Sequence, residues 1–230
     1  KRLAVIGGGA AGMAAAITAA ERGHAVHLFE KQSRLGGQLT LAHRPPHREE
    51  IERLLDYFRA EVARLDIEVS LNASPSADAV RALGADALIV AIGAEPVLPS
   101  VPGAELAHVL QGWRVLAGLE TPGPNCVVVG GGLVGVEVAD MLADGGRKVV
   151  LVARSELLKK AVHADRVHYL DRVDSFGIEV MSHTQVLEIR PGEVVLEPEN
   201  RLRRTLGGVD SVIYCMGYHR REAEAEGYRD

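Results

Sequence analysis

The stretch Val5-Ile6-Gly7-Gly8-Gly9-Ala10-Ala11-Gly12 decides the fold of this chain, and Val128-Val129-Gly130-Gly131-Gly132-Leu133-Val134-Gly135 repeats it 123 residues later, counted from Gly7 to Gly130. Each copy joins a short apolar run to a helical pattern. This G-x-G-x-x-G spacing is typical of a strand–turn–helix unit that binds a dinucleotide. One copy is a weak signal, but two in the same setting predict two dinucleotide sites. Such a protein can pass electrons between two cofactors.

Composition and charge fit an ordinary globular chain of 230 residues, with 47% hydrophobic and 25% charged residues. The net charge of −5 favours neither nucleic acid nor an anionic membrane as a partner. Cys126 and Cys215 stand in apolar runs, so we interpret both as buried packing residues. The chain has no C-x-x-C pair, which argues against a dithiol–disulfide reductase. Without a long apolar run or a signal peptide, we expect a soluble cytoplasmic protein.

Strands that alternate with helices predict an α/β fold with parallel sheets. We expect two Rossmann-like dinucleotide-binding domains, one at residues 1–104 with 217–230 returning to it, and one at residues 105–216. The abrupt start at Lys1 suggests a fragment of a longer protein. The predicted strands are 3–7, 25–30, 67–71, 87–92, 149–152, 178–181, 186–189, 193–196 and 209–215. The predicted helices are 10–22, 49–65 and 164–176, and 126–142 forms the second strand–glycine–helix unit.

The glycines of the first copy have separate physical roles. Gly7 allows the tight turn, Gly9 lets the backbone approach a pyrophosphate, and Gly12 lets the helix pack closely on the strand. Ala10 and Ala11 begin that helix, whose N-terminus offers unpaired N–H groups to the phosphates. The sequence therefore predicts a phosphate cradle at this turn.

Glu30 ends the next predicted strand, followed by Lys31. A carboxylate at this distance from the glycines can accept hydrogen bonds from both hydroxyls of an adenosine ribose. The alternative is a solvated glutamate at a strand end. We favour the ribose role for Glu30 and include Lys31 among the candidate cofactor contacts.

In the second copy, Gly130, Gly132 and Gly135 repeat the turn, approach and packing roles, and Leu133 and Val134 begin the helix. This predicts a second cradle with the same backbone.

The end of the following strand differs from the first copy, since Ala153 replaces the ribose carboxylate and Arg154 comes next. A guanidinium suits a 2′-phosphate, which a carboxylate would repel. We therefore favour NADPH over NADH, with an exposed strand-end arginine as the alternative. Glu137, in the first turns of the helix, is a candidate contact to the nicotinamide or a favourable charge near the helix N-terminus.

Two further segments indicate which family of dinucleotide-binding proteins the chain resembles. Arg34-Leu35-Gly36-Gly37-Gln38-Leu39 follows the ribose glutamate, and a later strand ends in Val90-Ala91-Ile92-Gly93. Together with Tyr57-Phe58 in a predicted helix, they resemble the C-terminal half of the NADH:flavin oxidoreductase family, which includes 2,4-dienoyl-CoA reductase and trimethylamine dehydrogenase. The resemblance implies the two-dinucleotide flavoprotein fold, truncated here at the C-terminus. It places Gly37 and Gln38 near an FAD pyrophosphate, and Ala91 and Gly93 behind the cofactor.

The resemblance also implies the reaction. An FAD-dependent NAD(P)H oxidoreductase would pass hydride from NADPH or NADH to FAD, and electrons onward to a covalently preceding barrel domain with FMN and a 4Fe-4S cluster, both outside this chain. The cofactors do the chemistry, so we name no catalytic side chain and no metal site. The alternative is a nucleotide-binding structural module that holds ADP, because Pro75 lacks the N–H that related flavoproteins offer to adenine.

Overall fold

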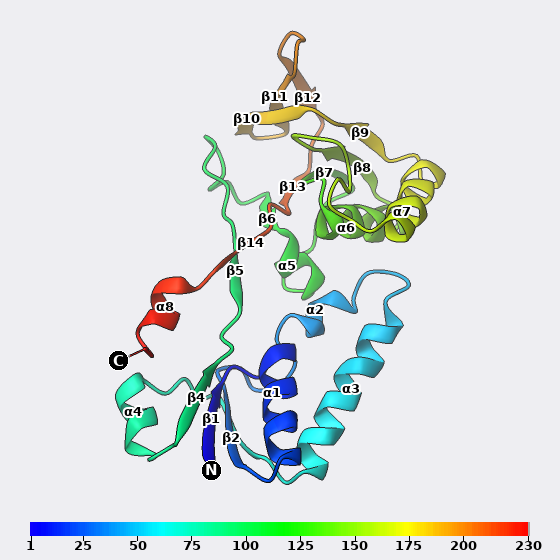
Figure 1. Cartoon of the computed structure of the whole chain (residues 1–230). Coiled ribbons are helices and arrows are strands. Elements are labelled where there is room, and N and C mark those ends of the chain that lie inside the picture. The colour runs from blue at the N-terminus through cyan, green and yellow to red at the C-terminus, as the bar shows by residue number, and fades with distance from the viewer. Residues whose placement is uncertain (230) are drawn as a thin grey trace. The chain divides into compact units, whose positions relative to one another are not determined.

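The computed structural model describes residues 1–229 and forms two compact units (Figure 1). Unit 1 holds Lys1–Glu95 and the chain from His219 onward, and unit 2 holds Pro96–Tyr218. Segment 96–104, which we assigned to the first domain, belongs to unit 2. The chain leaves unit 1 at β5 (Ala94–Pro96) and returns at β14 (Tyr218–Arg220), and these two strands pair with each other.

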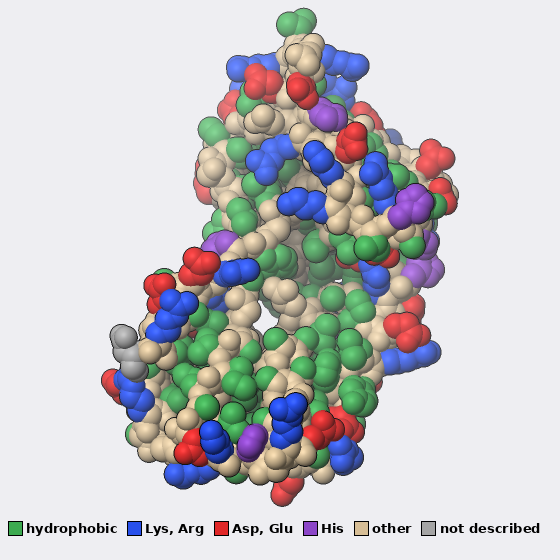
Figure 2. Space-filling view, viewed as in Figure 1, with side chains coloured by type: hydrophobic (Ala, Val, Ile, Leu, Met, Phe, Trp, Pro, Cys, Tyr) green, Lys and Arg blue, Asp and Glu red, His purple; other side chains and the backbone are tan. Residues whose placement is uncertain are grey.

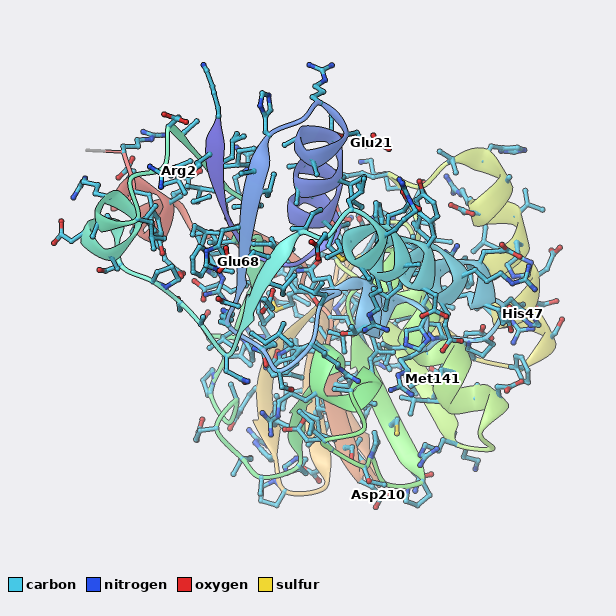
Figure 3. All side chains as sticks on the ribbon, turned by 90° about the horizontal axis from the view of Figure 1, so that it is seen from below. Arg2, Glu21, His47, Glu68, Met141 and Asp210 are labelled. Atoms are coloured by element: carbon cyan, nitrogen blue, oxygen red, sulfur yellow. The ribbon has the colours of Figure 1, made fainter. Side chains whose placement is uncertain are left out.

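Unit 1 is built on a four-stranded sheet in the order β3-β2-β1-β4. All three pairings are parallel. Figure 3 labels Arg2 and Glu68 where β1 and β3 begin, at the end of the sheet opposite to the glycine turn. The elements are β1 (Arg2–Ile6), α1 (Ala10–Glu21), β2 (Ala25–Glu30), α2 (Leu39–Ala42), α3 (Glu49–Arg64), β3 (Glu68–Leu71), α4 (Ala77–Ala82), β4 (Ala87–Val90) and α8 (Glu222–Glu226).

Alternate residues of β1 and β2 serve two cores, as the two-residue period of a strand requires. Val5 and Leu28 pack with α1 and α3 on one face of the sheet. Ala4 and Phe29 pack on the other face with Val80 of α4. α1 is rich in alanine, which favours helix, and it ends before Gly23, which adopts a φ of 79°.

Unit 2 has a parallel sheet in the order β6-β13-β7-β8-β9 and an antiparallel sheet in the order β10-β11-β12. Buried residues of both sheets share one core, and α5, α6 and α7 pack beside the parallel sheet (Figure 1). The elements are β6 (Val109–Gln111), α5 (Gly112–Leu116), β7 (Asn125–Val129), α6 (Leu133–Asp144), β8 (Lys148–Val152), α7 (His163–Ser175), β9 (Glu179–Met181), β10 (Thr184–Arg190), β11 (Glu193–Pro198), β12 (Arg204–Gly207) and β13 (Ser211–Tyr214).

The predicted α/β class with two Rossmann-like parallel sheets is confirmed. Short elements such as α4 and β12 escaped prediction because few residues carry too little periodicity. In the described part of the chain, no helix is both long and apolar enough to cross a membrane. On the face that Figure 2 shows, acidic and basic side chains are interspersed.

Candidate nucleotide-binding sites

The first glycine turn is closed by backbone contacts that leave no room for side chains. Gly7 adopts a φ of 106°, and a Cβ there would collide with the carbonyl oxygen of Ala91. A Cβ on Gly12 would collide with the carbonyl oxygen of Gly7. Both glycines therefore shape the turn itself, in agreement with the roles that the spacing predicts.

Gly9 lies at the open part of this turn. A Cβ on Gly9 would meet only the Cα of Gly37, at 3.9 Å. Gly9 is the N-cap of α1, no side chain caps this helix, and Ala10 and Ala11 at its start are exposed. Within residues 1–229 the Gly9 N–H has no hydrogen-bond acceptor. The turn thus presents free backbone donors, as a phosphate cradle requires.

Glu30, at the end of β2, holds its carboxylate against this turn. Its Oε2 accepts the Gly8 N–H at 2.7 Å, and its Oε1 accepts the Gln32 N–H at 2.7 Å. Glu30 is only 5% exposed, whereas Lys31 beside it is exposed. The two N–H groups orient the carboxylate, whose remaining lone pairs can accept ribose hydroxyls.

The loop after β2 is fastened to the same turn. The Gly36 N–H donates to the Gly8 carbonyl at 2.8 Å. A Cβ on Gly37, which has a φ of 51°, would lie 2.9 Å from the Cα of Gly9. Gln38 is exposed next to this contact. The structure therefore brings Gly37 to the cradle and places Gln38 beside it.

The second glycine turn repeats the first in unit 2. Gly130 adopts a φ of 138°, and a Cβ there would collide with the carbonyl oxygen of Cys215. A Cβ on Gly135 would collide with the Gly130 oxygen, while one on Gly132 would meet nothing within 4 Å. Leu133 and Val134 begin α6, which no side chain caps. The closed and open positions thus match those of the first turn.

The surroundings of the second turn differ in charge. Ala153 is 3% exposed and occupies the position of Glu30, so no carboxylate faces the Gly131 N–H. This N–H has no acceptor among residues 1–229. Arg154 is exposed and makes no hydrogen bond or ion pair with another described residue. A free donor and a free guanidinium are the groups that a phosphate monoester needs.

Glu137 is 7% exposed, and the Tyr169 hydroxyl of α7 donates to its Oε1 at 3.0 Å. One turn further along α6, Asp140 accepts hydrogen bonds from the Arg172 Nε, at 2.9 Å to its Oδ1 and 2.7 Å to its Oδ2. This hydrogen-bonded carboxylate raises the pKa of Arg172. Sequence reasoning missed Tyr169, because 32 residues separate it from its partner. Glu137 is thus held by α7, and its role toward the nicotinamide stays a prediction.

A strand end passes behind each glycine turn. Ala91 donates its N–H to Ile6 at 2.8 Å behind the first turn, followed by Gly93 with a φ of 74°. Cys215 donates its N–H to Val129 at 2.8 Å behind the second. Burial raises the pKa of the Cys215 thiol to about 12. The thiol therefore stays protonated at neutral pH, and its residue serves to support the turn.

Two glycine turns on parallel sheets are typical of proteins that bind two dinucleotides. The family model of pyridine nucleotide-disulphide oxidoreductases matches residues 1–228, and the chain belongs to this family. Bilirubin reductase from Mediterraneibacter gnavus is 37% identical over 94% of this chain and 34% of its own length. NADH oxidase from Thermoanaerobacter brockii is 42% identical over 83% of this chain and 30% of its own length.

Solved structures agree with these relatives. 2-Naphthoyl-CoA reductase superposes with a TM-score of 0.91 at 25% identity, covering 98% of this chain and 34% of that one. The 6-hydroxypseudooxynicotine amine oxidase of Pseudomonas geniculata superposes with a TM-score of 0.87 at 28% identity, covering 100% of this chain and 37% of that one. The chain thus spans about a third of the length of these relatives. The predicted resemblance and the assignment to FAD-dependent oxidoreductases are confirmed.

Proposed function

We propose that the chain is the electron-input module of a flavoprotein, with FAD held at Gly7–Gly12 and NADPH at Gly130–Gly135. When bound, the nicotinamide and the flavin supply the hydride chemistry. The two cradles fit these groups, because Gly9 and Gly132 leave open space where backbone donors face outward. The protein's own contribution is to bind and orient both nucleotides.

In unit 1 the residues suit an adenosine diphosphate moiety. The Gly9 N–H and the start of α1 would hold the pyrophosphate, and Glu30 would accept the ribose hydroxyls. Gly37 and Gln38, which the Gly36–Gly8 hydrogen bond fastens beside the turn, would line the rest of the cofactor.

In unit 2 the single observation that carries the preference for NADPH is the exchange of a carboxylate for Ala153-Arg154. Arg154 would bind the 2′-phosphate in a bidentate manner. The Gly131 N–H would be a further donor, whereas the equivalent Gly8 N–H of unit 1 already donates to Glu30.

Dissociation constants of NADPH and NADH for wild type and Arg154→Ala test this preference. We expect NADPH affinity to fall about tenfold or more, with NADH nearly unchanged. Arg190→Ala is the matched control, since Arg190 is an exposed arginine of the same unit that pairs with Glu188. Equal loss of both nucleotides, or no loss, removes the 2′-phosphate role.

The family resemblance extends the proposal to electron delivery into a preceding FMN barrel domain, through a 4Fe-4S cluster. The reductase and oxidase names of longer relatives support this direction. The competing function is a structural module that holds ADP. Purified protein with flavin absorbance that NADPH bleaches supports the redox function. Colourless protein that releases ADP on denaturation supports the structural module.

A further inference from the structure

Arg59, on α3, makes a contact that the proposed function does not use. Its guanidinium donates twice to the Leu35 carbonyl, at 3.2 Å from Nε and 2.7 Å from Nη2. The third nitrogen lies 3.6 Å from Asp56, and the Arg59 side chain is 36% exposed. α3 thereby reaches the loop that is fastened to the first glycine turn.

The contact continues through the backbone toward the cradle. The Leu35 carbonyl shares its peptide group with the Gly36 N–H, which donates to the Gly8 carbonyl at 2.8 Å. The Gly8 carbonyl shares its peptide group with the Gly9 N–H. In a trans peptide group the C=O and N–H point in opposite directions, and no peptide bond of the described chain is cis. A chain of hydrogen bonds therefore leads from the guanidinium to the Gly9 N–H.

The second turn has the same backbone link without the charge. The Leu158 N–H donates to the Gly131 carbonyl at 2.8 Å, as Gly36 does to Gly8. The Leu157 carbonyl, which corresponds to that of Leu35, accepts no hydrogen bond from any described residue. The guanidinium is thus specific to the first cradle.

We propose that Arg59 is a positioning residue of the first nucleotide site, which acts through two peptide groups to strengthen the Gly9 N–H as a donor to a pyrophosphate. Hydrogen bonds in such a chain polarise one another, and a cation at its start increases the effect. The ligand is a dinucleotide that stays bound, such as FAD. A second cradle without the cation suits a nucleotide that leaves after each turnover. The inference rests on the proposed function for the identity of the bound group.

The test compares a ligand that has a pyrophosphate with one that lacks it. FAD binding to the full chain is measured by flavin fluorescence, and ADP and adenosine are measured as competitors of FAD, so that all constants refer to one site. We expect Arg59→Met to raise the dissociation constants of FAD and ADP roughly threefold, because the variant weakens one hydrogen bond to a charged group and does not remove it. The dissociation constant of adenosine should not change, because adenosine does not reach Gly9.

Arg59→Lys should weaken FAD and ADP binding less than Arg59→Met does, because the ammonium keeps the positive charge and a hydrogen-bond donor. Arg64→Met is the control, since Arg64 lies on the same helix but pairs with Glu61 and Glu21. If Arg59→Met weakens the binding of ADP and adenosine equally, Arg59 has a merely structural role. If ADP binding is unchanged, Arg59 has no role at the site. Either result overturns this inference and leaves the proposed function intact. A wild-type chain that binds no FAD overturns the proposed function as well.

Discussion

In unit 1 the Gly8 N–H donates a hydrogen bond to the Glu30 carboxylate. The corresponding Gly131 N–H of unit 2 lies beside the buried Ala153 and has no hydrogen-bond partner in the described chain. The backbone turns are otherwise alike: each has one glycine at positive φ against a strand-end carbonyl and one open position. We propose that glycine spacing builds the cradle, while the side chains around it select the nucleotide. Three predictions test that division, and a fourth tests the burial of titratable groups in unit 2.

The largest effect should come from the closed positions. Gly7→Val places a β-branched side chain at a φ of 106° and against the Ala91 carbonyl. We expect unit 1 to lose about 3 kcal/mol of unfolding free energy, from backbone strain and steric overlap together. Urea unfolding measures the loss. Gly207→Ala is the control, since its added Cβ meets nothing within 4 Å. Wild-type stability of Gly7→Val would contradict the closed turn.

The next effect concerns selection. Ala153→Glu restores in unit 2 the carboxylate that unit 1 has at Glu30. It should accept the Gly131 N–H and ribose hydroxyls, and repel a 2′-phosphate. We expect the ratio of NADPH to NADH affinity to fall about a hundredfold, as one charge is added beside the phosphate. Titration with each nucleotide gives the ratio. An unchanged ratio would mean that this strand end does not contact the ribose.

A smaller effect is expected at the open positions. Gly9→Ala and Gly132→Ala add a methyl group for which both turns have room, since the closest contact is 3.9 Å at Gly9 and none lies within 4 Å at Gly132. Each should keep its stability but weaken its own cofactor about tenfold, by holding the phosphates off the backbone. FAD and NADPH titrations of both variants measure this. Loss of the same cofactor in both variants would contradict two separate sites.

The smallest effect is a pH dependence of unit 2. Burial raises the pKa of Cys126 to about 11 and those of Tyr214 and Cys215 to about 12. The folded state therefore holds these protons more tightly than the unfolded state. Their stabilisation is complete below the ordinary thiol pKa near 9.0 and is lost as pH rises toward 12.

Unfolding of unit 2 can be followed separately, because Trp113 is the one tryptophan of the sequence and lies in this unit. We expect its free energy of unfolding in urea to fall between pH 8 and 10, by about 1 kcal/mol for each buried thiol. The variant Cys126→Ala should lose less unfolding free energy over the same pH range. A midpoint that rises with pH would contradict the burial of these groups.

Local patterns predicted much of the fold. The helices after both glycine turns and the strands β1, β2, β8, β10 and β11 all agree with the structure. The domain boundary does not, because segment 96–104, which we assigned to the first domain, packs in unit 2, where Gly103 lies against Ile189. A breaker marks a junction, but the packing on either side decides which unit each residue joins.

The sequence by itself determined the two cradles, because a glycine turn and the helix that follows it need only residues close together in the chain. It also determined the unequal strand ends, Glu30 and Ala153-Arg154. The tertiary structure alone decided which groups meet across long separations: the Arg59 guanidinium with Leu35, 24 residues away, and Tyr169 with Glu137, 32 residues away. Such contacts depend on how a helix packs against its neighbours, and no local periodicity encodes that geometry.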